Sequence, residues 1–152
     1  MSENKPDLQP EKPKHTGARR KAREFVLQLL YQLDYDPDTV DLAQRLELFW
    51  QENKCQPSVK SFAEELVRGT LAHLEPIDQM ISRLAVNWKI ERMAMIDRNI
   101  LRFAAYEILY RDDIPPKVSI NEALEIAKKY STPGSIGFIN GILDKIAHQS
   151  KL

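Results

Sequence analysis

The chain is poor in the residues that build disulfide-bonded and loop-rich folds. It has five glycines and a single cysteine, Cys55, among 152 residues. One cysteine excludes an intrachain disulfide and a cysteine-based zinc site. The scarcity of glycine argues against an all-β or loop-rich fold. A reducing compartment fits this composition.

Long apolar segments are also missing. The first residues, MSENKPDLQPEKPK, are polar and lack the apolar run of a signal peptide. The longest uncharged stretch, residues 130–143, contains Pro133 and glycines, whereas a membrane-spanning helix needs about 20 apolar residues. We therefore expect no membrane association and a cytoplasmic protein.

Net charge is the third absence, because 22 basic residues are balanced by 22 acidic ones. A strongly basic chain would indicate a nucleic-acid partner, so here any RNA-binding surface must come from uneven placement of charge. Hydrophobic residues make up 43% and charged residues 29%, a balance that fits a globular protein rather than a wholly disordered one.

Apolar residues recur at helical spacing from Ala18 onward. The first amphipathic helix is predicted over residues 18–35 and ends at Asp36-Pro37-Asp38. Asp38 or Thr39 is expected to cap the second helix, because short polar side chains accept hydrogen bonds from free backbone N–H groups.

Two further helices are predicted before residue 85. The third begins at Ser58, or at Ser61 with Glu64 as a capping box. The fourth carries Pro76 at its first position, where proline is favoured.

The segment from Met95 to Tyr110 is apolar on most of its circumference and predicts a central, buried helix. Ser119 and Glu122 form the clearest capping box and are expected to open the next helix. A last helix is predicted over residues 135–147.

Together these patterns predict an all-α fold of about seven helices packed in two bundles. Residues 1–17 are predicted to be a disordered N-terminal tail, since they hold prolines, mixed charge and almost nothing to bury. Residues 18–152 are predicted to form one helical domain, with subdomains at about 18–73 and 75–149.

The residues for catalysis are missing. His15, His73 and His148 share no metal-ligand spacing, and Cys55 has no histidine nearby in sequence. The Gly137-x-x-x-Gly141 pair is best interpreted as a site of close helix packing. We therefore predict no catalytic residue, no metal, no cofactor and no enzymatic activity.

Basic residues cluster at the start of the first predicted helix, with no acid among them: Lys14, Arg19, Arg20, Lys21 and Arg23. Arginine suits bidentate phosphate contacts and stacking on bases. The alternative is a set of solvated charges, which would be mildly unfavourable at the positive end of a helix dipole. From composition alone, both interpretations stay open.

Sequence motifs in order along the chain resemble the NusB family. They are ARRKARE at 18–24 followed by QLLY ending at Tyr31, ILRFAAYEIL at 100–109, and KVSINEALEIAK at 117–128 continued by FINGILDK at 138–145. The resemblance covers essentially the whole chain from residue 18. It implies a fold of two packed helical bundles.

The resemblance also implies a function. Proteins similar to this one bind the boxA element of nascent ribosomal RNA transcripts together with a small ribosomal protein, called NusE in this role. The pair acts in the RNA polymerase antitermination complex, which reads through terminators, and it catalyses no reaction. A homodimer that covers the arginine-rich face is a possible variant that the sequence leaves open.

Carried over position by position, the resemblance assigns RNA binding to Arg19, Arg20, Lys21, Arg23 and Phe138. It assigns the partner surface to Tyr31 and Asp97. One departure concerns residues 133–137, which read PGSIG. Many relatives have an acidic pair before the serine and a basic residue before the phenylalanine, so the basis for a phosphate contact at Gly137 is lost.

Two other functions remain as alternatives. One is the targeting module of an RNA-modifying methyltransferase, which is disfavoured because the 152 residues leave no room for a cofactor-binding α/β domain. The other is a protein–protein adaptor that never touches RNA.

Overall fold

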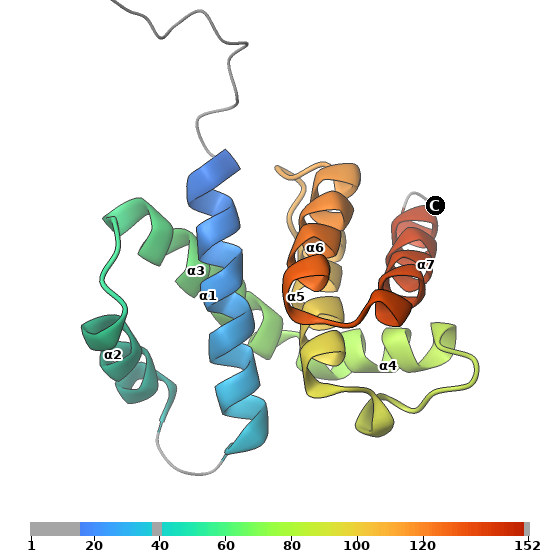
Figure 1. The fold of residues 1–152 in the computed structure, drawn as a ribbon, viewed down its shortest axis with the longest axis horizontal. Helices are drawn as coiled ribbons and strands as arrows, with labels where there is room; N and C mark the ends of the chain where they lie inside the picture. Colours follow the sequence, from blue (N-terminus) through green and yellow to red (C-terminus); the bar gives the residue numbers. More distant parts are fainter. Residues whose placement is uncertain (1–15, 38–40, 151–152) are drawn as a thin grey trace, which may run out of the picture.

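The computed structural model describes residues 16–37 and 41–150, which fold entirely into helices and their connections (Figure 1). The predicted all-α class is confirmed. The predicted tail over residues 1–17 lies outside the described residues except for Thr16 and Gly17, which belong to the first helix. The elements are α1 (Thr16–Tyr35), α2 (Leu42–Glu52), α3 (Pro57–Ala72), α4 (Leu74–Leu84), the 3₁₀ turn η2 (Ile90–Arg92), α5 (Met95–Tyr110), α6 (Pro116–Tyr130) and α7 (Pro133–Ser150).

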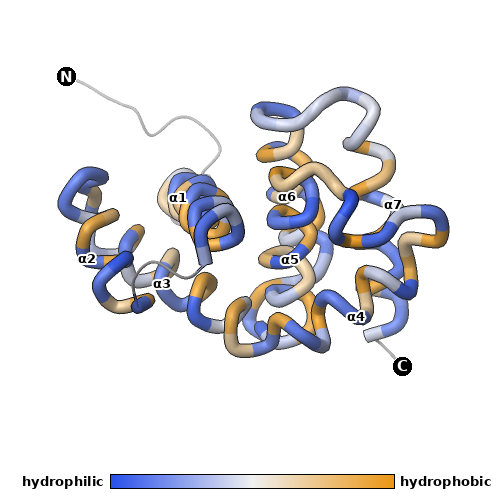
Figure 2. Tube along the Cα trace, turned by 90° about the horizontal axis from the view of Figure 1, so that it is seen from below, coloured by the Kyte–Doolittle hydropathy of each residue, from blue (hydrophilic) through white to orange (hydrophobic). Residues whose placement is uncertain are grey.

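Helix α5 is the centre of the fold, as its all-round apolarity predicts. Helices α1–α3 lie on one side of it and α4, α6 and α7 on the other (Figure 1). The side chains of Ile100, Leu101 and Phe103 are fully buried. Hydrophilic and hydrophobic residues alternate along the other helices, as amphipathic helices around a shared core require (Figure 2). The division into subdomains stays a prediction.

A polar cluster joins the two sides at the end of α1. Asp34 accepts hydrogen bonds from Arg98 at 2.7 and 2.9 Å and from Asn99 at 2.9 Å. Arg102 bridges Asp34 to Asp78 of α4. Burial raises the pKa of Asp34, but the bonds from Arg98 and Asn99 outweigh it and hold that pKa below its ordinary value. The charged carboxylate therefore ties α1 to α5.

Several helices begin at residues other than those that the capping patterns predicted. The side chain of Asp41 caps α2 by accepting from the Gln44 backbone N–H at 2.8 Å, whereas the expected caps Asp38 and Thr39 lie outside the described residues. Helix α3 begins at Pro57, so the expected caps Ser58 and Ser61 lie inside it.

The strongest capping pattern is also wrong, since Ser119 and Glu122 lie within α6, which begins at Pro116. The Ser119 hydroxyl donates to buried Glu107 at 2.8 Å, and Glu122 binds Arg20. Ser119 and Glu122 have the residue types and spacing of a capping box, but their side chains bind Glu107 of α5 and Arg20 of α1 instead.

Two more helices begin earlier than predicted. Helix α4 begins at Leu74, two residues before Pro76, and α7 begins at Pro133 rather than at Ser135. Proline is tolerated throughout a first turn, because the first four N–H groups of a helix have no partner within it.

Glycine has a packing role at Gly69 but not in α7. The Tyr106 ring of α5 lies directly against Gly69, where an added Cβ would overlap its atoms. Around Gly137 and Gly141, in contrast, a Cβ would meet nothing within 4 Å. The predicted close helix packing at the Gly137 and Gly141 pair is therefore wrong, since both residues are exposed.

We expect Gly69→Ala to lower the free energy of unfolding by about 1–3 kcal/mol, the usual cost of overpacking. The Tyr106 ring cannot move freely, because it stacks on Tyr110 with 5.6 Å between ring centroids. The matched control, Gly141→Ala, should stabilise the protein by up to about 1 kcal/mol through helix propensity. Urea unfolding measures both, and a stabilising Gly69→Ala would contradict the close contact.

Candidate nucleic-acid interface

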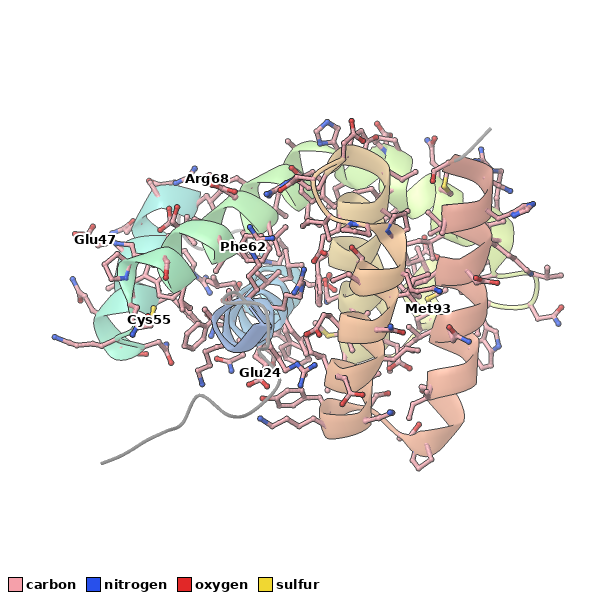
Figure 3. The ribbon with its side chains drawn as sticks, turned by 90° about the horizontal axis from the view of Figure 1, so that it is seen from above. Glu24, Glu47, Cys55, Phe62, Arg68 and Met93 are labelled. Carbon is pink, nitrogen blue, oxygen red and sulfur yellow. The ribbon has the colours of Figure 1, made fainter. Side chains whose placement is uncertain are left out.

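Two cations at the start of α1 lie over aromatic rings rather than in ion pairs. The Arg19 guanidinium is 4.3 Å from the centroid of the Phe62 ring, which lies between α3 and α1 (Figure 3). The Lys21 ammonium is 4.9 Å from the Phe25 centroid, and its side chain is exposed. Within the part of the chain that the structure describes, neither cation forms a salt bridge. Their charges therefore remain available to an anion.

The third cation of this group, Arg20, is already paired. Its Nε and Nη2 donate to the two carboxylate oxygens of Glu122 in α6, at 2.9 and 2.8 Å. The hydrogen bonds that Arg20 donates to Glu122 raise the pKa of Arg20 and lower the pKa of Glu122. The Arg20 side chain remains 42% exposed.

Arg23 does not fit the RNA contact predicted for it, because only 3% of its side chain is exposed. Its guanidinium donates to Glu107 of α5 at 2.8 and 2.9 Å, and Ser119 of α6 donates to the same carboxylate. At this position α1 faces α5, so a cation close in sequence to the exposed ones is sealed inside. We correct its role to holding α1, α5 and α6 together.

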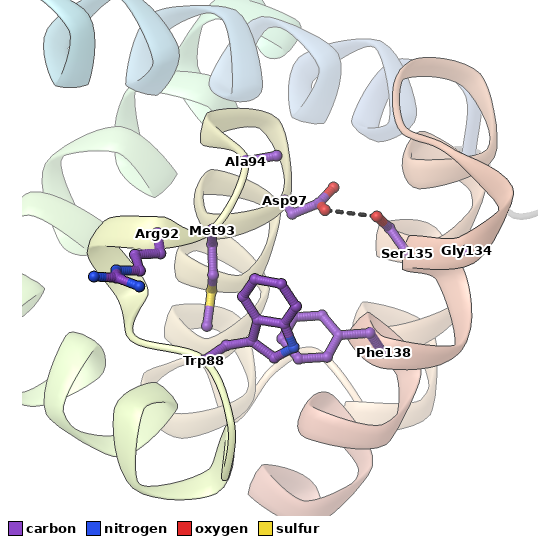
Figure 4. Close-up of a pocket in the computed structure, with 8 residues that line it drawn as sticks. All are labelled: Trp88, Arg92, Met93, Ala94, Asp97, Gly134, Ser135 and Phe138. Atoms are coloured by element: carbon purple, nitrogen blue, oxygen red, sulfur yellow. Dashed lines mark hydrogen bonds between the residues drawn. The ribbon is translucent and has the colours of Figure 1, made fainter.

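A pocket of 390 Å³ lies between the loop after α4, the start of α5 and the start of α7 (Figure 4). The Trp88 side chain points toward it from the loop after α4 and the Phe138 side chain from α7, with Met93 beside them. The Trp88 side chain is 54% exposed. Arg92 also lines the pocket, and its guanidinium extends away from the rings. The pocket therefore offers flat aromatic surface with a cation nearby.

Sequence reasoning predicted Phe138 for this surface but missed Trp88 and Arg92. Both lie in the irregular segment between α4 and α5, where helical periodicity carries no information. A large aromatic residue among polar neighbours was the one available signal.

The structure brings together Tyr31 and Asp97, the two residues predicted for the partner surface. Both line a second pocket, of 350 Å³, with Tyr130 and the turn between α6 and α7. Tyr31 is 39% exposed, whereas Asp97 is only 7% exposed. Asp97 accepts hydrogen bonds from Ser135 (Figure 4) and from Ser131, which fix this turn against α5. Partner binding by this pair stays a prediction.

Between the basic start of α1 and these pockets, α1 and α6 run side by side (Figure 1). Glu24, which projects from α1 in Figure 3, accepts from Lys129 Nζ at 3.2 Å and from the Tyr130 hydroxyl at 3.2 Å. The hydrogen bond that Lys129 donates to Glu24 raises the pKa of Lys129. Lys129 thus adds a cation on α6 beside α1, paired with Glu24.

Other kinds of site find no support in the described residues. No group of three or more histidine, cysteine, aspartate or glutamate side chains is arranged to hold a metal ion there. None of the helices in residues 16–37 and 41–150 is both long and apolar enough to span a membrane.

The fold and these surfaces define a two-bundle helical protein with a cationic helix end and an exposed aromatic pocket. A family model described as the NusB family matches residues 20–148, and the chain belongs to this family. The resemblance found in the sequence is thereby confirmed.

Similar proteins agree with this membership. The chain is 52% identical to the transcription antitermination protein NusB of Thermodesulfovibrio yellowstonii, over 86% of this chain and 92% of that protein. It is 47% identical to the NusB of Myxococcus xanthus, over 86% and 95% respectively.

Solved structures show the same fold. A structure of T. maritima NusB, 41% identical, matches with a TM-score of 0.78 over 92% of this chain and 94% of that one. A complex of the antitermination factors NusB and NusE with double-stranded RNA contains a chain 24% identical, with a TM-score of 0.79 over 88% and 98%.

Proposed function

We propose that this protein is a transcription antitermination factor that binds boxA RNA of ribosomal RNA transcripts together with the ribosomal protein NusE. In this role it would support read-through by RNA polymerase, in the bacterial cytoplasm and without catalysing a reaction. Its family membership supports the proposal, as do relatives that carry the antitermination name. The main structural observation in its favour is that Arg19 and Lys21, at the start of α1, lie over aromatic rings and form no ion pair within the described residues.

The surface has the two features that single-stranded RNA requires. Phosphates need cations that are not neutralised within the protein, and Arg19 and Lys21 meet this condition. Unstacked bases need accessible aromatic rings, which Trp88 and Phe138 supply in the pocket between the loop after α4, α5 and α7. Because the protein has no net charge, attraction for RNA has to come from local placement of cations such as Arg19 and Lys21.

The partner is proposed to bind near Tyr31 and Asp97. An exposed tyrosine ring beside a pocket is a common anchor in protein interfaces, since it offers a large apolar area and a polar end. No residue from the start of α1 lines this pocket. NusE and RNA would therefore bind different parts of the protein and could do so simultaneously.

Salt dependence of boxA binding tests the proposal. We expect Arg19→Ala/Lys21→Ala to weaken boxA binding by about tenfold and to make the slope of log K against log salt shallower by about 1.4, because each lost phosphate contact removes about 0.7 from the slope of a single strand. A fluorescence titration at several salt concentrations, with and without NusE, measures both.

The control is Lys54→Ala/Lys60→Ala, which removes the same charge from two exposed residues beside α2 and α3. It should bind boxA almost as the wild type does. An equal loss of boxA affinity in both double variants would mean that the total charge matters and the position of Arg19 and Lys21 does not. A NusE complex that ignores boxA even in dilute buffer would instead favour the adaptor function.

A further inference from the structure

The contact between α1 and α6 depends on ion pairs rather than on close packing. Helix α1 packs extensively against α3 and α5, but within the described residues its contacts with α6 are sparse. The links between α1 and α6 include Arg20 with Glu122 and Glu24 with Lys129. Ion pairs of this kind can exchange partners when a stronger anion arrives.

Arg20 differs from its neighbours in how it is held. Arg19 and Lys21 lie over aromatic rings, which leaves their N–H groups open to anions. Arg20 instead donates two parallel hydrogen bonds to the carboxylate of Glu122. A phosphate group binds arginine through the same bidentate geometry. Glu122 therefore occupies the edge of the guanidinium that an RNA phosphate would use.

The exchange of Glu122 for a phosphate is physically feasible on both sides. The Arg20 side chain is 42% exposed, so its guanidinium can turn outward without opening the core. Glu122 keeps a second cation, because Arg23 Nη1 lies 4.0 Å from its carboxylate. The carboxylate left behind would thus retain a partner and would not be stranded as an isolated buried charge.

We propose that Glu122 limits RNA affinity by holding Arg20 in an ion pair that an RNA phosphate must displace. The inference rests on the proposed function and adds a residue that sets how tightly this interface binds. Lys129 is likewise held by Glu24, but it lies outside the basic cluster at the start of α1, and the paired Arg23 of that cluster is buried.

The test is boxA affinity of Glu122→Gln in the full chain with NusE present. Glutamine keeps the side-chain shape and removes the charge, so Arg20 is released more readily. We expect binding to tighten about fivefold, which is about 1 kcal/mol at 1.4 kcal/mol per tenfold. The matched control is Glu125→Gln, one turn along α6, which makes the same charge change at an exposed glutamate paired with Lys128 at 3.1 Å. It should change affinity less than about twofold.

A double variant separates the ion pair from general charge. In an Arg20→Ala background, Glu122→Gln should no longer tighten binding, because the cation that it releases is gone. A gain that persists without Arg20, or an equal gain in Glu125→Gln, overturns the proposal.

Glu122→Asp guards against a folding defect, since it keeps the net charge while shortening the carboxylate. It should tighten binding about twofold, and circular dichroism checks the helices of every variant. If neither Glu122 variant binds more tightly while the wild type binds boxA, this inference fails and the proposed function stands. If the wild type does not bind boxA, the proposed function fails and the inference falls with it.

Discussion

Replacing Glu107 with alanine should lower the free energy of unfolding by about 3–5 kcal/mol, the usual cost of stranding one partner of a buried ion pair. Glu107 is 1% exposed and is the carboxylate to which Arg23 donates two hydrogen bonds and Ser119 a third. Its loss leaves a buried guanidinium with no hydrogen-bonded carboxylate and with only Glu122 at 4.0 Å as a nearby anion. Urea unfolding followed by circular dichroism measures the change.

The control replaces both partners, as Arg23→Met/Glu107→Leu. An apolar pair of similar volume removes the stranded charge, so stability should return to within about 2 kcal/mol of the wild type. The same variant tests the corrected role of Arg23. Because Arg23 is buried, boxA binding should be unchanged, and a tenfold loss in the folded double variant would restore Arg23 to the RNA contacts.

Removing both rings of the aromatic pocket, as Trp88→Ala/Phe138→Ala, should weaken boxA binding about a hundredfold. Stacking on an aromatic side chain is worth about 1–3 kcal/mol per base, and two stacks of about 1.4 kcal/mol give this factor. Trp88 is more than half exposed, but Phe138 packs against the core, so circular dichroism must show that the helices of the variant are intact. Fluorescence titration with labelled RNA measures the loss.

The salt slope distinguishes these rings from the cations. Stacking releases no counterions, so the ring variant should keep the wild-type slope while losing affinity, unlike Arg19→Ala/Lys21→Ala. Leu48→Ala, at an exposed apolar residue of α2, is the control and should bind as the wild type does. An unchanged affinity in the ring variant would remove the pocket from the interface.

The sequence was sufficient for the fold class and for α5. A helix that is apolar all round leaves a periodic signal that needs no knowledge of its neighbours, and residues 95–110 were predicted with the bounds that the structure shows. Helix starts were less predictable. Ser119 and Glu122 have the types and spacing of a cap, and only the folded chain reveals that Glu107 and Arg20 are their partners.

The candidate site shows the same limit. Clustering in sequence identified the basic start of α1, but it could not tell which side of the helix is covered. Arg19 and Lys21 face outward, whereas Arg23 faces α5. Trp88 and Arg92 were missed because they come near Phe138 only through the loop between α4 and α5.

Asp97 borders both pockets, and so does Ser135 of the turn that its carboxylate fixes. A ligand on one side that pulls at Ser131 or Ser135 would therefore alter the wall facing the other. Thermodynamic linkage makes any such influence mutual, so an occupant of the Tyr31 side would change affinity on the Phe138 side by the same factor as the reverse. The carboxylate of Asp97 would then couple the binding of a protein to the binding of a nucleic acid, although the two ligands do not contact each other.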